Sequence, residues 1–203
     1  MAILSSSRPS VALVKTRWRK NGTRTLPEVA GILGANVWKI ALEVSKHMER
    51  EGFRFGSDRT VMNVLTEFIA FLVQLIDRSV YAKIPEADRA TLIAETVRHL
   101  AATMENNQQD LLGPGDYLKP FISLLNARFA DYATFDFPGA APDYACLSYF
   151  SDKVSDAMVS DPDAGGDNKW VTEQMMDIEA PEMVLLVRKL IARTVPAAPA
   201  PQA

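Results

Sequence analysis

Apolar residues recur every three to four positions along most of the chain, which is the spacing of an amphipathic helix. The first such stripe is closed by Gly52 and consists of Leu33, Val37, Ile40, Ala41, Val44 and Met48. No segment alternates apolar and polar residues between turn signals, as a half-buried strand would. The pattern therefore predicts an all-α protein.

The most apolar stretch of the chain runs from about Ser57 to Lys83, and Ser57 and Asp58 are good capping residues for its start. Its apolar positions cover more than half of a helix circumference and leave a narrow polar strip of Asn63, Glu67, Gln74 and Arg78. We expect this helix to be the most buried. Its longest wholly apolar run, 68–73, has six residues. A membrane-spanning helix needs roughly 20, so we expect none.

Proline and glycine divide the rest of the chain into further helices. Pro85 is followed by acids, which is typical of a helix start, and that helix extends to about Gln109. Asp116 can cap the next helix, and two more are expected over about 143–160 and 168–193, with a kink or break at Pro181. Together these segments predict an irregular antiparallel bundle of about six helices.

The 203 residues suffice for one hydrophobic core, which we place in a single domain over residues 26–194. Residues 1–25 contain six basic residues and no acid, so we expect a flexible basic arm; a targeting peptide and docked structure remain alternatives. Residues 195–203 are rich in proline and alanine and are expected to be disordered. The one cysteine, Cys146, cannot form an internal disulfide, which fits a cytoplasmic protein.

The net charge of −3 hides an acidic second half, because residues 131–182 carry 12 acids and only two lysines. The same part of the chain is rich in aromatic residues, which are favoured at protein interfaces. The residues predicted to contact a ligand or protein partner are Arg128, Tyr132, Phe135, Phe137, Tyr144 and Tyr149. The alternative is that this segment is a long loop folded back onto the bundle.

Arg128 falls on the apolar face of its predicted helix. A buried guanidinium must be paired and hydrogen-bonded, and Asp131, Asp136 or Asp77 could be its partner. In a functional alternative, Arg128 instead grips an anionic ligand in a cleft, in an internal pocket that also uses His47 and acids such as Glu67.

Both histidines follow a glutamate by four residues, in the pairs Glu43 with His47 and Glu95 with His99. Residues four apart share a helix face and could ligate a metal. Carboxylate-bridged di-metal bundles, however, space glutamate and histidine by three. We therefore expect ordinary helix pairs and no metal or other cofactor. Residues 161–172 begin like a calcium loop but lack its fifth-position ligand and its final glutamate, so we expect a turn.

Other chemistry has weak support. Trp18 lies between two arginines, yet the body of the chain is acidic, which disfavours nucleic acid as a partner. The sequence contains no glycine-rich phosphate loop and too few histidines for a well-supported nucleophile and base pair. We therefore expect a non-enzymatic interaction or assembly protein that binds a protein partner, or a second copy of itself, through the acidic, aromatic-rich second half. A helical small-ligand-binding protein or enzyme with a pocket around Arg128 and His47 is the alternative.

Overall fold

A computed structural model describes residues 24–81, 83–159 and 170–195. These ranges are helical between short turns and contain no strand, which confirms the predicted all-α bundle. The elements are α1 (Leu26–Arg50), α2 (Asp58–Val80), α3 (Glu86–Leu112), α4 (Leu118–Tyr132), the 3-10 turn η1 (Pro138–Ala140), α5 (Tyr144–Val159), α6 (Val171–Gln174), the π-turn η2 (Met175–Glu179) and α7 (Ala180–Thr194). Most of the turn predicted over residues 161–172, and nearly all of the predicted arm and tail, lie outside the described residues.

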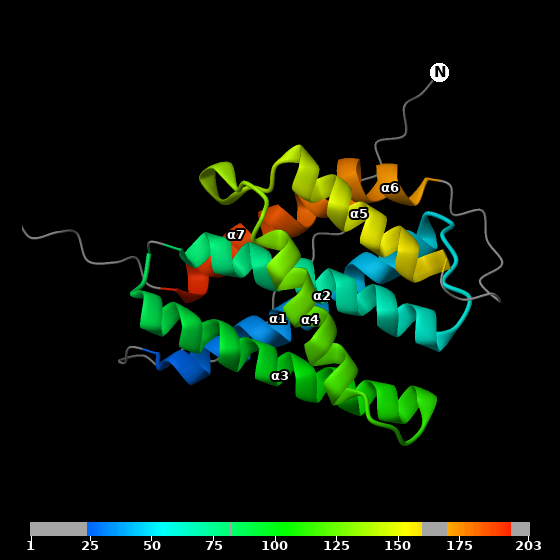
Figure 1. Cartoon of the computed structure of the whole chain (residues 1–203), viewed down its shortest axis with the longest axis horizontal. Helices are drawn as coiled ribbons and strands as arrows, with labels where there is room; N and C mark the ends of the chain where they lie inside the picture. The colour runs from blue at the N-terminus through cyan, green and yellow to red at the C-terminus, as the bar shows by residue number, and fades with distance from the viewer. Residues whose placement is uncertain (1–23, 82, 160–169, 196–203) are drawn as a thin grey trace, which may run out of the picture.

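Helix α2 is the centre of the bundle, and α1, α3, α4, α5 and α7 all pack against it (Figure 1). It is long and apolar enough to span a membrane by length and composition, although its longest unbroken apolar run is short. In this structure 83% of its most apolar window is buried by the other helices. The apolar surface of α2 is therefore used to form the core of the bundle.

The polar strip predicted on α2 is mostly covered as well. Asn63 is exposed, but Glu67 and Gln74 are buried and Arg78 is half-buried. The reason is that α4 and α5 pack on α2 in addition to α1 and α3. Polar groups of the central helix consequently need partners from the helices that cover them.

The start of α1 is set by a capping box. The Thr25 hydroxyl accepts a hydrogen bond from the Glu28 amide, and the Thr25 amide donates to the Glu28 carboxylate at 2.9 Å. These two bonds satisfy donors that the first helical turn leaves free, and Pro27 removes one such donor altogether.

The chain stays helical through Pro181, where the sequence predicted a kink or break. The backbone at Glu179 has φ −77° and ψ −45°, and Ala180 is also helical. The irregularity is instead the π-turn Met175–Glu179 just before it. Proline lacks an N–H and its ring crowds the carbonyl four residues earlier, so a wider turn at this point keeps α6 and α7 connected.

Candidate functional site

The most strongly paired polar groups of the core are Glu67 on α2 and Arg128 on α4. The Arg128 Nε and Nη2 atoms each donate to one carboxylate oxygen of Glu67 at 2.7 Å. The Glu67 side chain is only 4% exposed and that of Arg128 19%. This is a bidentate ion pair between two helices, the strongest form of a charge-assisted hydrogen bond.

Two further side chains extend the pair into what we call the Arg128 network: Glu67, Arg128, Asp131 and Tyr149. Arg128 Nη1 lies 3.4 Å from the Tyr149 hydroxyl and 3.7 Å from the Asp131 carboxylate. The Tyr149 hydroxyl donates to Asp131. The network thus joins α2, α4 and α5 through one guanidinium.

Burial and pairing oppose each other in this network. Burial raises the pKa of Glu67, and the hydrogen bonds and charge of Arg128 counteract that rise. Hydrogen bonding to Glu67 raises the pKa of Arg128 despite its partial burial. Burial and the bond to Asp131 raise the pKa of Tyr149 to about 12. Arg128 and Tyr149 therefore keep their protons at neutral pH and act as donors.

Most of the aromatic residues predicted to contact a partner face the interior. Tyr132 is fully buried and meets Tyr149 edge-on at 5.4 Å between ring centroids. Phe135 packs on both of these rings. Phe137 lies beneath the Arg78 guanidinium, and Tyr144, in contrast, is 77% exposed. Of the predicted contact set, then, Tyr144 alone is largely exposed.

Tyr132 has a buried hydroxyl with no hydrogen-bond partner among the described residues. Burial raises the pKa of this phenol well above its usual value, and the nearby Glu67 carboxylate adds to the rise. The Cys146 thiol is also buried, and its pKa is raised to about 12. Neither group is a nucleophile at neutral pH, because only the deprotonated forms react readily.

His47 belongs to a second cluster, at the π-turn. Its Nδ1 atom lies 2.6 Å from the Glu179 carboxylate, which also accepts a hydrogen bond from Gln174 at 2.7 Å. The other imidazole nitrogen is 3.6 Å from Glu51. Glu179 is buried, so this cluster ties α1 to the start of α7. The His47 cluster shares no residue with the Arg128 network. Arg128 and His47, which the sequence analysis placed in one pocket, therefore belong to two separate clusters.

The glutamate and histidine pairs do not meet at a metal site. Glu43 pairs with Lys46 and Glu95 with Arg98, while the His99 side chain lies against Gly31 on α1. Nowhere in the described ranges do three or more histidine, cysteine or acidic side chains form a group that could hold a metal ion.

The buried pair predicted for Arg128 exists, but its main partner is Glu67 and not one of the three aspartates considered. Asp131 is a longer contact, and Asp77 pairs with Arg89. A signal for Glu67 was present, since it is an acid on the narrow polar strip of the most apolar helix. Glu179 was missed, although an acid four residues from both Met175 and Met183, on an apolar stripe, could have indicated it.

No protein-family model, curated protein or solved structure matches this chain. Its function is therefore inferred from its own residues and their arrangement.

Proposed function

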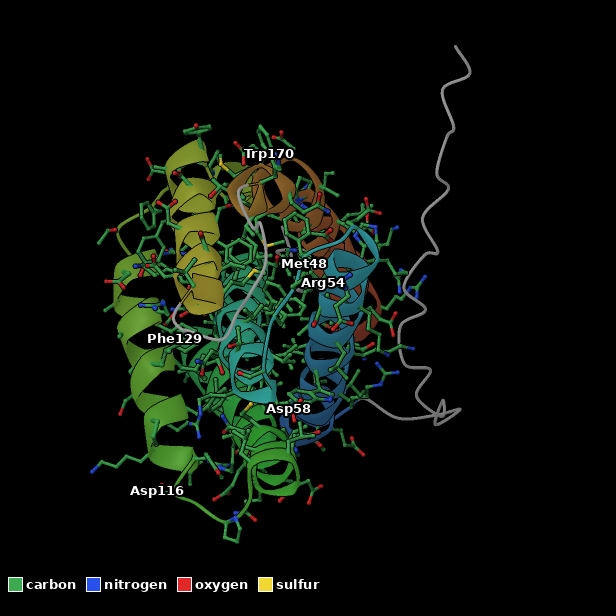
Figure 2. All side chains as sticks on the ribbon, turned by 90° about the vertical axis from the view of Figure 1, so that its right-hand side faces the viewer. Met48, Arg54, Asp58, Asp116, Phe129 and Trp170 are labelled. Atoms are coloured by element: carbon green, nitrogen blue, oxygen red, sulfur yellow. The ribbon has the colours of Figure 1, made fainter. Side chains whose placement is uncertain are left out.

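We propose that the chain is a non-enzymatic protein-binding module and that its contact surface is the layer formed by α5, α6 and η2. The observation that carries the proposal is the exposure of large apolar side chains. Among the large apolar side chains of the described residues, the three with the greatest exposed fraction are Tyr144 at 77%, Val159 at 70% and Trp170 at 67%. All three lie in or next to this layer, and Figure 2 shows Trp170 at the outer edge of the molecule.

Acidic side chains surround these apolar groups. On α5, the exposed residues Tyr144, Asp152, Asp156 and Val159 fall within about 120° of a helical wheel and so share one face. On the adjacent segment, Glu173 and Asp177 are exposed and four residues apart. We call these six residues and Trp170 the outer acidic face. Helices α5 and α6 pack side by side, on the side of α2 away from α3 (Figure 1).

This composition suits a basic protein segment with apolar side chains. Exposed aromatic groups supply contact area at low entropic cost, and surrounding carboxylates attract and orient a positively charged partner. A second copy of this chain fits the same description, because residues 1–24 carry six bases and no acid.

The buried polar groups support a structural role more than a catalytic one. Both oxygens of Glu67 are engaged by Arg128, and Glu179 is held by His47 and Gln174. A ligand-binding role for Arg128 would require Glu67 to release it, at the cost of leaving a buried carboxylate unpaired.

Site-specific photo-crosslinking tests the proposal. A photoreactive amino acid at position 144 or 170 is expected to capture a specific partner, or a second copy, in host extract. The same group at Asn106, an exposed residue of α3, is the matched control. Neutralising the face with D152N, D156N, E173Q and D177N should reduce capture, as should raised salt.

Equal capture at position 106, or capture that neither salt nor the four substitutions reduce, would contradict the proposal. Light scattering of the purified protein separates the two kinds of partner. A dimer that the four substitutions dissociate identifies the partner as a second copy.

A further inference from the structure

The N-terminal segment of the chain is the chemical complement of the outer acidic face. Residues 1–24 carry six bases and no acid, and four of these bases lie within the stretch 15–20, together with Trp18. The outer acidic face combines four carboxylates with three large exposed apolar side chains. A basic stretch with an aromatic side chain therefore matches both the charge and the apolar character of this face.

Three carboxylates of the outer acidic face are free to pair with another molecule. Among the described residues, Asp152, Glu173 and Asp177 form no ion pair, whereas Asp156 accepts a hydrogen bond from Lys153 at 2.8 Å. All four acids are exposed. Because exposed like charges on neighbouring helices repel each other, bases from a partner would be attracted to this face and relieve the repulsion.

The start of α1 lies far from the α6 end of this face. Arg24 is at the C-terminal end of α7, where its Nη1 atom donates to the Arg193 carbonyl at 3.5 Å. The elements α6, η2 and α7 form one continuous helical segment over residues 171–194, which is about 35 Å long. Trp170 directly precedes the opposite end of that segment, toward the end of α1 that carries Met48 (Figure 2).

The basic stretch of one copy cannot place Trp18 against Trp170 of the same copy. An extended chain spans at most about 3.5 Å per residue, so Trp18 can extend at most about 21 Å from Arg24. Trp170 is separated from the Arg24 end of the bundle by the full helical segment, about 35 Å. The outer acidic face of a second copy is not subject to this limit.

We infer that the basic stretch 15–20 of one copy binds the outer acidic face of a second copy, so that the chain associates with itself through its N-terminal segment. The bases pair with the free carboxylates, and Trp18 packs on the exposed apolar side chains. This inference rests on the proposed function, since it names the partner of that same face.

Crosslinking of the purified, full-length protein tests the inference. A photoreactive aromatic amino acid replaces Trp18, and equal amounts of isotope-labelled and unlabelled protein are mixed before irradiation. Mass spectrometry of the digest then identifies the captured residues. We expect crosslinks from position 18 to the outer acidic face, in pairs that contain one labelled and one unlabelled peptide.

Matched double substitutions show whether the acids of this face are responsible. E173Q/D177N should reduce the mixed pairs about tenfold, because the bases of the partner lose two carboxylates. D88N/D110N removes the same charge from exposed positions of α3 and should leave the crosslinks unchanged. R17Q/R19Q should reduce them as E173Q/D177N does, and raised salt should have the same effect.

Crosslinks found only within one copy, or mixed pairs that E173Q/D177N and D88N/D110N reduce equally, would overturn the inference. The proposed function fails separately. If position 18 gives no mixed pairs but position 144 or 170 still captures another protein in host extract, the face binds a partner that is not this chain.

Discussion

Arg128 can bring a full charge into the contact between α4 and α2 because Glu67 meets it with both carboxylate oxygens. The sequence was sufficient to predict that this cation is paired, since it lies on an apolar helix face. It was not sufficient to choose the partner, which is 61 residues away. That choice depends on which face of α2 the fourth helix covers.

Replacing Arg128 with leucine is expected to destabilise the protein by about 2–4 kcal/mol at neutral pH, because Glu67 is left buried without its counter-charge. Chemical denaturation measures this change. The double variant E67L/R128L should recover much of the loss, since removing both partners leaves no stranded charge. An R128L protein as stable as the wild type would refute the structural importance of the pair.

The loss in R128L should depend on pH. Burial already raises the pKa of Glu67 above its usual 4.5, and without Arg128 nothing on α4 counteracts the rise. A carboxyl group whose pKa is higher in the folded than in the unfolded protein stabilises the fold fully at a pH below its unfolded-state pKa. That stabilisation is lost as the pH rises through its folded-state pKa. R128L should therefore become progressively less stable than the wild type once the pH exceeds the folded-state pKa of Glu67 in the wild type, which already lies above 4.5, by at most about 1.4 kcal/mol per pH unit.

The two histidines offer a matched comparison. His47→Leu removes a donor from the buried Glu179 and should cost about 1–3 kcal/mol, although Gln174 remains bonded to that carboxylate. His99→Ala changes an exposed side chain and should stay within about 0.5 kcal/mol of the wild type. Thermal or urea unfolding of both variants measures the loss of stability. Equal losses in the two variants would show that the His47 cluster does not stabilise the fold more than an exposed side chain does.

Among the elements, α1 and α3 show how a helix pair depends on small residues. Two glycines of α1 face His99 on α3. A Cβ added at Gly34 would lie 3.1 Å from the His99 Cβ, whereas one at Gly31 would lie 3.6 Å from the imidazole, an ordinary contact. The close approach of the two helices is therefore specific to Gly34.

Replacing Gly31 and Gly34 with alanine should therefore have opposite effects on stability. Gly31→Ala should stabilise the protein by about 0.5–1 kcal/mol through helix propensity alone. Gly34→Ala should destabilise it by about 1 kcal/mol, because overpacking against a Cβ fixed to the α3 backbone costs about 1–3 kcal/mol and outweighs the same gain. Urea midpoints of the two variants check this, and equal stabilisation by both would show that α3 can shift away from α1.

Most helix ends followed from local chemistry, as in the Pro85 start of α3 and the Ser57 cap of α2. The polar strip of α2 shows the limit of such reasoning. A helical wheel indicates which positions are polar, but it does not show whether another helix will cover them. Here α4 and α5 cover most of the strip, and Glu67 becomes the most strongly paired acid of the core.

At the scale of the whole molecule, the described helices share one buried core in which α2 contacts most of the others. We therefore expect unfolding to be a single cooperative transition. Urea unfolding followed by circular dichroism at 222 nm and by tryptophan fluorescence should give the same midpoint. Replacing Trp18 and Trp38 with phenylalanine leaves Trp170 as the one tryptophan of the chain. In that variant, a fluorescence midpoint at clearly lower urea would show that the layer of α5 and α6 around Trp170 unfolds separately, which would contradict the single predicted domain.

By itself, the sequence determined that the chain is helical, where most helices begin and end, and that α2 forms the interior. These properties depend on capping residues, prolines and the period of apolar positions, which act over a few residues. Only the tertiary structure decided the partners of Arg128 and His47 and the inward orientation of most aromatic residues. Such contacts join residues far apart in the chain, and they depend on which helix faces pack together.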